Sequence, residues 1–197
     1  MRVRLVYIIG MPSGGTKATA GALKANGFWC PRHTGSIECE EAYDALKGRY
    51  SAKTPERMPD KPESAEAVEI ARKVFESYKS RAANADYDKC FMKAPGMPIW
   101  CPELFVDVDP LLVWREPEEC ARSMINRAAL KHLTKGKTED EIRAYVCKGQ
   151  DEIERLHTVY GWPMWRFGRD ADICELEKAV GVPLPIKFFD PVMIKTR

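Results

Sequence analysis

The stretch VRLVYIIGMPSGGTKATAGALKANG occupies residues 3–27 and contains three kinds of sequence in succession. Residues 3–9 are rich in β-branched and aliphatic side chains, and such a short apolar run is typical of a buried strand. Glycines, a proline and a serine follow at 10–15 and predict a tight turn. The small, helix-forming residues 16–26 then predict a helix that Gly27 closes. A strand, a glycine turn and a helix in this order are the building unit of layered α/β folds.

The glycine turn has a spacing that suits an anion. Four residues separate Gly10 from Gly15, as in a phosphate-binding P-loop. A turn of this kind exposes backbone N–H groups and the amino end of a helix, and both attract phosphate. The next residues are Thr16 and Lys17, whereas an ATP-binding loop has Lys before Ser or Thr. Lys17 therefore leaves the helix about 100° from the usual direction, while the Thr16 hydroxyl stays well placed. We predict a phosphate site; the alternative is a glycine turn without a ligand.

The rest of the chain alternates between strand-like and helix-like segments. Short apolar runs predict strands at 28–30, 90–92, 111–114 and 163–167. Helical periodicity and capping residues predict helices at 63–81, at 117–130, after the capping box of Thr138 and Glu141, and from Asp170 to Gly181. This alternation predicts an α/β three-layer sandwich around a central, mainly parallel sheet of about five strands. We expect a single domain over residues 1–197, with a loop-rich excursion at 31–62 that contains a short helix near 40–46.

Composition excludes several classes of protein. The 197 residues are 45% hydrophobic and 30% charged with a net charge of +2, which favours a packed domain and gives no reason to expect a nucleic-acid partner. No stretch approaches the roughly 18 apolar residues of a membrane-spanning helix, and residues 5–9 are too few for a signal peptide. The seven cysteines form no CxxC pair and favour reduced core thiols. We expect a cytoplasmic protein whose anion site is local.

A second group of polar residues follows a predicted strand. Arg115 comes directly after the apolar run 111–114, and Ser123 lies in the helix that follows. In open α/β sheets, ligands bind at the carboxyl ends of the strands. Arg115 offers a cationic fork to a phosphate, and Ser123 can add a hydroxyl donor. The alternative is that Arg115 pairs with Glu118 or Glu119 and that Ser123 is simply buried.

These segments resemble the motifs of sulfotransferases that use PAPS, 3′-phosphoadenylyl sulfate. Residues 10–16 are similar to the 5′-phosphosulfate loop of that family, approximately G-x-P-[RK]-S-G-T-[ST], and Arg115 and Ser123 have the separation of its 3′-phosphate motif, R-x-P-x5-S. Residues 91–95 resemble the family's K-x-P strand end. Residues 35–38 resemble a short segment of bacterial relatives, G-[YF]-x-E, and residues 165–183 resemble the closing strand and helix of compact members. The resemblance implies a compact member of bacterial or viral type, with a P-loop NTPase-like fold.

The resemblance also implies an activity and roles for individual residues. It implies transfer of a sulfuryl group from PAPS to a hydroxyl or amine of a small-molecule or glycan acceptor, without a metal. The loop residues that would hold the 5′-phosphosulfate are Ser13, Gly14, Gly15, Thr16 and Lys17, and those that would hold the 3′-phosphate are Arg115 and Ser123. Lys17 or Lys93 would neutralise the leaving phosphate, and Glu38 would act as the general base, with His33 in reserve. For Glu38, a solvated loop carboxylate is the alternative.

Two departures from the family pattern bear on activity. Ser13 stands where the family usually has Arg or Lys, so the expected loop cation is missing, and Lys17 is the candidate to replace it. Pro95 stands where cytosolic relatives carry a catalytic histidine. Because of these departures, a second interpretation stays open: a protein that binds PAP, the desulfated product, without catalysing transfer.

A P-loop kinase for a small molecule or nucleotide is the other alternative. Its support is the same glycine loop together with Asp107 and Asp109, because an acid after an apolar run could hold magnesium. The reversed order of Thr16 and Lys17 counts against it. The sequence names neither the acceptor nor the oligomeric state.

Overall fold

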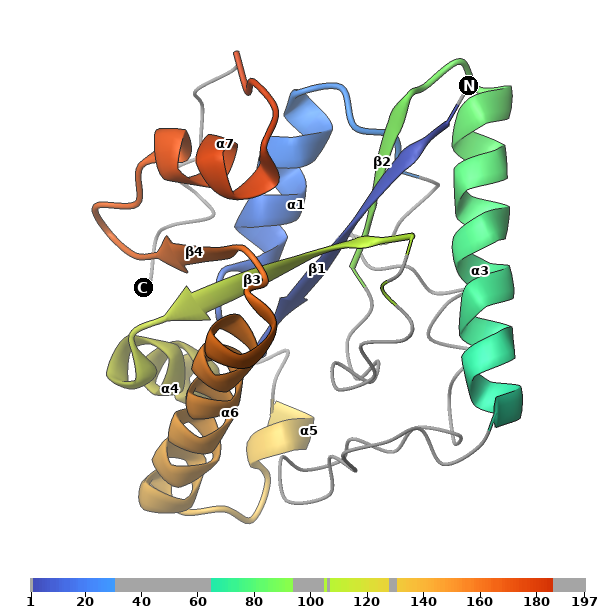
Figure 1. Cartoon of the computed structure of the whole chain (residues 1–197). Helices are drawn as coiled ribbons and strands as arrows, with labels where there is room; N and C mark the ends of the chain where they lie inside the picture. The colour runs from blue at the N-terminus through green and yellow to red at the C-terminus, as the bar shows by residue number, and fades with distance from the viewer. Residues whose placement is uncertain (1, 31–64, 94–104, 106, 128–130, 186–197) are drawn as a thin grey trace.

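The computed structural model describes residues 2–30, 65–93, 105, 107–127 and 131–185. Four strands in this part of the chain form one parallel sheet in the order β2-β1-β3-β4. The strands are β1 (Arg4–Gly10), β2 (Lys89–Met92), β3 (Asp109–Arg115) and β4 (Met164–Phe167). The predicted α/β fold with a parallel sheet is confirmed (Figure 1).

The fifth predicted strand, at 28–30, is reduced to a single bridge. Trp29 pairs in parallel with Cys90 of β2. Its N–H donates to the Lys89 carbonyl at 2.8 Å, and its carbonyl accepts from the Phe91 N–H at 3.2 Å. Because Cys90 also pairs with Leu5 of β1, Trp29 lies on the outer side of β2.

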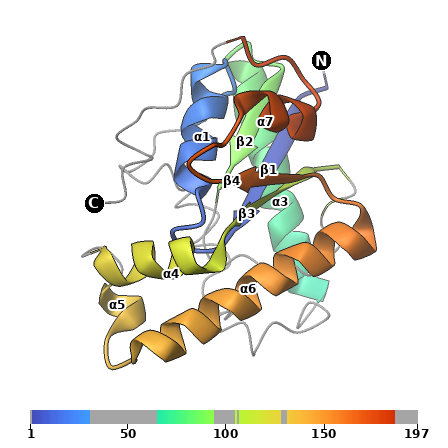
Figure 2. The same ribbon diagram turned by 90° about the vertical axis from the view of Figure 1, so that its left-hand side faces the viewer.

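Helices cover both faces of the sheet, since side chains of a strand alternate between its two faces. On one face lie α3 (Ala65–Asn84), α4 (Pro117–Asn126) and α6 (Glu139–Tyr160), which share a core with Leu5, Tyr7 and Ile9 of β1. On the other face lie α1 (Thr16–Ala25) and α7 (Ile173–Val180), which share a core with Val6 and Ile8. Figures 1 and 2 show the sheet between these two groups of helices.

No helix in the described residues has the length and apolar character needed to cross a membrane.

Several helix ends differ from the sequence predictions. The capping box at Thr138 is confirmed, because Thr138 Oγ1 accepts from the Glu141 N–H at 3.2 Å and the Glu141 carboxylate accepts from the Thr138 N–H at 2.7 Å. The predicted cap at Asp170 is wrong: Asp172 caps α7 by accepting from the Cys174 N–H at 2.8 Å. Helix α4 ends at Asn126 rather than at 130, and a short helix, α5 (Lys131–Thr134), follows it. The excursion at 31–62, with its predicted helix, lies outside the described residues.

The strand order defines where a ligand can bind. The chain leaves β1 for β2 on one side and later returns to β3 on the other side of β1. The connections therefore diverge between β1 and β3, which is the topological switch point at which open parallel sheets bind ligands. Gly10 pairs with Val113 there, so the turn after β1 lies next to the carboxyl end of β3. Figure 2 shows α1 and α4 both beginning at this end of the sheet.

Candidate functional site

The turn after β1 has a conformation that its residues impose. The Gly14 N–H donates to the Met11 carbonyl at 2.9 Å, and Ser13 between them has a φ of 65°. Pro12 at the second position and a positive φ at the third are the features of a type II turn. A Cβ on Gly14 would stand 2.9 Å from the Met11 carbonyl oxygen, so the turn closes too tightly there for a side chain.

Gly15 meets two requirements at once. Its φ is 99°, in the region that favours glycine, and a Cβ there would stand 2.4 Å from the ring of Phe167 at the end of β4. The ring therefore packs directly under the backbone of the loop. Gly10 is similarly restricted, because a Cβ would stand 2.6 Å from Thr16 Cγ2. The loop touches its neighbours through its backbone, and its glycines cannot be replaced without moving it.

The amino end of α1 is left without a cap. The first backbone bond of the helix is donated by the Thr19 N–H to the Gly15 carbonyl at 3.0 Å, and Gly15 has no side chain to cap the helix. Among the described residues, no acceptor meets the N–H groups of Thr16, Lys17 and Ala18, and the first turn holds no acid. Helices α6 and α7 are both capped by side chains. Unpaired backbone donors and the positive end of the helix dipole thus meet at the switch point.

Two polar side chains of the loop add donors to this end. Ser13 Oγ is buried and has no hydrogen-bond partner in the described part of the chain. Lys17 is half-buried, and no ion pair or hydrogen bond to its ammonium is found among the described residues. An unpartnered buried hydroxyl costs free energy unless something binds it. Both side chains therefore suit a bound anion.

Arg115 lies beside the loop, and it also has an acid partner. Its guanidinium is buried, with 6% of the residue exposed, and its Nη1 donates to the Ser13 carbonyl at 2.9 Å. Its Nε lies 3.4 Å from the carboxylate of Glu119, so the alternative of an ion pair is present as well. The ring of Phe167 lies under the guanidinium at 5.6 Å. Within the described residues, Nη2 of Arg115 has no partner and remains a donor.

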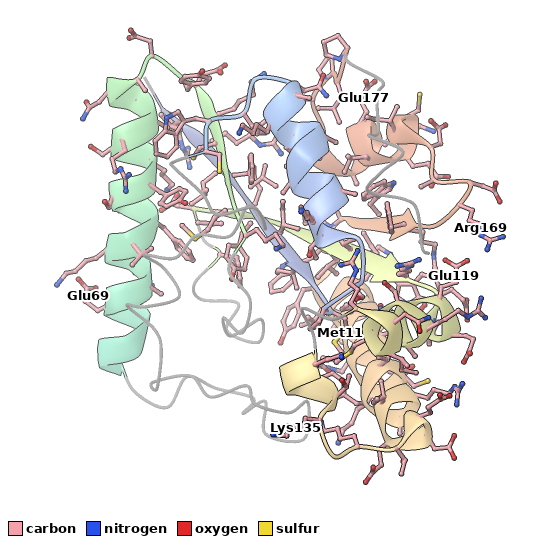
Figure 3. All side chains as sticks on the ribbon, turned by 180° about the vertical axis from the view of Figure 1, so that it is seen from behind. Met11, Glu69, Glu119, Lys135, Arg169 and Glu177 are labelled. Atoms are coloured by element: carbon pink, nitrogen blue, oxygen red, sulfur yellow. The ribbon has the colours of Figure 1, made fainter. Side chains whose placement is uncertain are left out.

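Helices α4 and α6 contact the loop from its other side, through residues for which the sequence predicts no role. The Cys120 thiol donates to the Pro12 carbonyl, with 3.2 Å between sulfur and oxygen. Met11 fills the space that Gly149 leaves on α6, where a Cβ would stand 2.1 Å from its sulfur. Figure 3 shows Met11 beside α4. The only sequence signal for these contacts is Gly149, a glycine inside an amphipathic helix.

The remaining predicted site residues are placed less closely. Lys93 directly follows β2, so it lies at the carboxyl end of the sheet, as the glycine loop does. It is buried, with 8% of the residue exposed. Ser123 is buried on α4, three residues beyond Cys120 and therefore on the same side of the helix. No contact between Ser123 and the loop is found among the described residues. The predicted bases Glu38 and His33, and Pro95, lie outside the described residues.

The acids that supported the kinase alternative lie at the wrong end of the sheet. Asp109 opens β3 and pairs with Arg4, while Asp107 pairs with Arg2 at 3.0 Å. Because β3 has seven residues, its two ends are roughly 20 Å apart. Neither carboxylate can reach a metal ion held at the glycine loop. In the described residues, no group of three or more His, Cys, Asp or Glu side chains could hold a metal ion.

The arrangement as a whole suits one kind of ligand. Backbone donors, a buried hydroxyl, an ammonium and a guanidinium gather around the carboxyl ends of β1 and β3, which is the chemistry of a phosphate or sulfate site. A scan of protein-family models finds no match to this chain, and a search of curated proteins finds no relative.

Proposed function

We propose that this protein binds PAP-type nucleotides, which carry phosphate groups at both the 5′ and 3′ positions, and transfers a sulfuryl group from PAPS to a hydroxyl or amine. One observation carries the proposal: the uncapped amino end of α1 lies at the switch point of the sheet, joined to Arg115 through the Ser13 carbonyl. The donors present fit a phosphate, since the buried Ser13 hydroxyl and three N–H groups lack partners among the described residues.

The chain's residues would divide the work as follows. The N–H groups of Thr16 and Lys17 and the Thr16 hydroxyl hold the 5′-phosphosulfate, and the positive helix end orients it. Lys17, or the buried Lys93, balances the charge that develops on the leaving phosphate. Arg115 Nη2, with Ser123, contacts the 3′-phosphate. The bound PAPS supplies an activated sulfuryl group, whose bond to the phosphate oxygen breaks as the acceptor oxygen or nitrogen attacks. The acceptor's proton passes to a base, for which Glu38 is the proposal and His33 the reserve.

A PAP-binding protein without transferase activity is the second candidate. Ser13 favours it, because the position that carries a cation in the resembled family here carries a hydroxyl, and Arg115 is already engaged with the Ser13 carbonyl and Glu119. A kinase is disfavoured by the position of Asp107 and Asp109 at the opposite end of β3.

Thermal unfolding with competing ligands tests the proposal. At about 100 times its dissociation constant, PAP should add about 2.7 kcal/mol of stability and raise the Tm by about 5–10 °C in the presence of EDTA. The variant Lys17→Ala should lose most of this rise, whereas Lys24→Ala, at the other end of α1, should keep it. Stabilisation by ADP with magnesium but not by PAP would contradict the proposal.

A transfer assay separates the two remaining candidates. The protein is incubated with radiolabelled PAPS and a panel of phenols, sugars and amines. Labelled product that depends on Lys17 identifies a transferase. PAP binding without label on any acceptor identifies the binding protein.

A further inference from the structure

The turn at the start of the loop contains one peptide group that could face either way. Met11 to Gly14 form a type II turn whose central peptide joins Pro12 to Ser13. Rotating this peptide by about 180° gives a type I turn, in which the third residue has a negative φ. A type I turn would relieve Ser13 of its φ of 65°, a conformation that is unfavourable for residues other than glycine. Something outside the turn must therefore hold the peptide as it is.

Cys120 is in position to do so. Its thiol donates to the Pro12 carbonyl at 3.2 Å, and that carbonyl belongs to the peptide group that would rotate. The residue is fully buried in α4. Burial raises the pKa of the Cys120 thiol to about 11, and the nearby Arg115 and the Gln150 side chain oppose that rise. The sulfur therefore keeps its proton near neutral pH and acts as a donor.

Gln150 of α6 lies near the Cys120 thiol and contacts the end of β3. The residue is 1% exposed, and its Oε1 accepts from the Arg115 N–H at 3.4 Å. Its Nε2 is buried and has no hydrogen-bond partner among the described residues. The end of β3, helix α4 and helix α6 thus meet at the sulfur of Cys120.

We propose that Cys120 is a positioning residue of the anion site, which holds the Pro12–Ser13 peptide so that the loop presents a donor rather than an acceptor to its ligand. In a trans peptide the C=O and N–H point in opposite directions, so a carbonyl held toward α4 turns the Ser13 N–H away from α4. Loss of the thiol would let the peptide rotate and place a carbonyl oxygen where the N–H had been. The inference rests on the proposed anion site, but not on the identity of the nucleotide.

Isothermal titration with PAP and with inorganic pyrophosphate tests the role of the thiol. We expect Cys120→Ala to weaken binding about fivefold, the worth of one hydrogen bond. Cys120→Ser, which keeps a donor, should stay within about twofold of the parent protein. Cys90→Ala removes an equally buried thiol from β2 and should leave affinity unchanged even if it lowers the Tm. Circular dichroism confirms that each variant is folded at the temperature of titration.

A double substitution tests the mechanism. Glycine adopts a positive φ without strain, so Ser13→Gly favours the type II turn by itself. In that background, Cys120→Ala should weaken binding by less than about twofold. Equal affinity of Cys120→Ala and the parent, failure of Cys120→Ser to restore binding, or the same loss in the Ser13→Gly background would each overturn the inference. If the parent protein binds neither PAP nor pyrophosphate, the proposed function and the inference both fall. If only pyrophosphate binds and Cys120→Ala weakens it, the inference stands and the nucleotide assignment is wrong.

Discussion

The Arg115 guanidinium has two partners, the Ser13 carbonyl and the Glu119 carboxylate. Nη1 fixes the Ser13 carbonyl of the loop, while Nε faces the carboxylate of Glu119, which is 29% exposed. A phosphate that approaches this guanidinium meets an acid already beside it. If a 3′-phosphate binds Nη2 as proposed, the nearby Glu119 carboxylate repels it and lowers the affinity for PAP.

Replacing Glu119 by glutamine tests this competition. The substitution keeps the size of the side chain and removes its charge, so we expect Glu119→Gln to bind PAP up to about fivefold more tightly, the range of a partly exposed ion pair. The affinity of the variant for AMP, which lacks the 3′-phosphate, should change little. Titration of both nucleotides gives the comparison. Glu118→Gln is the control, because Glu118 pairs with Arg143 of α6 rather than with Arg115. If the affinities for PAP and AMP changed equally, Arg115 would not contact the 3′-phosphate and would only position the loop.

At the scale of elements, the sequence predicts best where local chemistry decides. The apolar run before Gly10 and the capping box at Thr138 each contain their own signal, and both are confirmed. Asp170 and Asp172 both precede the same helix, and nothing in their spacing tells which carboxylate reaches an N–H. Residues 28–30 have strand-like chemistry, but only Trp29 pairs in the sheet, at its outer side.

In the candidate site, too, some contacts could be predicted from local sequence and others could not. The glycine loop and Arg115 could be found in the sequence because their spacing is similar to known phosphate motifs, and the structure joins them. The contacts of Cys120 with Pro12 and of Phe167 with Gly15 could not, since each brings together residues that are far apart in the sequence. Such contacts depend on how α4 and β4 pack against the sheet, and no local pattern records that packing.

The capping box of α6 predicts a stability that depends on pH. Hydrogen bonds from the Thr138 N–H and hydroxyl hold the pKa of Glu141 below its usual value of 4.5. A carboxyl whose pKa is lower in the folded protein contributes stability above its unfolded pKa and loses it as pH falls through the folded value. We expect the protein to have a higher Tm than Glu141→Gln at pH 7. The difference should shrink as pH falls below the usual pKa of 4.5 and should vanish only below the lowered pKa of the folded protein. Thermal scans from about pH 3 to 7 measure it.

Thr138→Ala serves as the control for this element. It removes the hydroxyl that caps α6 and should cost about 1 kcal/mol at pH 7. In the Thr138→Ala background, the pH-dependent effect of Glu141→Gln should shrink, because one of the two hydrogen bonds that lower the pKa is gone. An undiminished effect would show that the charge acts through the helix dipole alone.

At the scale of the whole molecule, the site lies where both helical layers meet the sheet. Phe167, under the loop, belongs to the core shared with α1 and α7, whereas Cys120, behind the loop, belongs to the core shared with α3, α4 and α6. Arg4 links strands and helix at the opposite end of the sheet. It pairs with Asp109 of β3, and its Nη2 donates to the Val180 carbonyl of α7 at 2.6 Å. The geometry of the loop therefore depends on both cores at once.

This dependence predicts that the described residues unfold as one unit. Leu23 of α1 and Leu112 of β3 are both fully buried, one in each core. Truncating either to alanine should cost about 2–5 kcal/mol. If the sheet couples the two cores, each variant should show one urea transition with an unchanged m-value, and PAP binding should be lost at that same midpoint. Tryptophan fluorescence and far-UV circular dichroism follow the transition, and titration at intermediate urea follows binding. Two separated transitions, or binding that survives the loss of one core, would mean that the layers fold independently and that the loop needs only one of them.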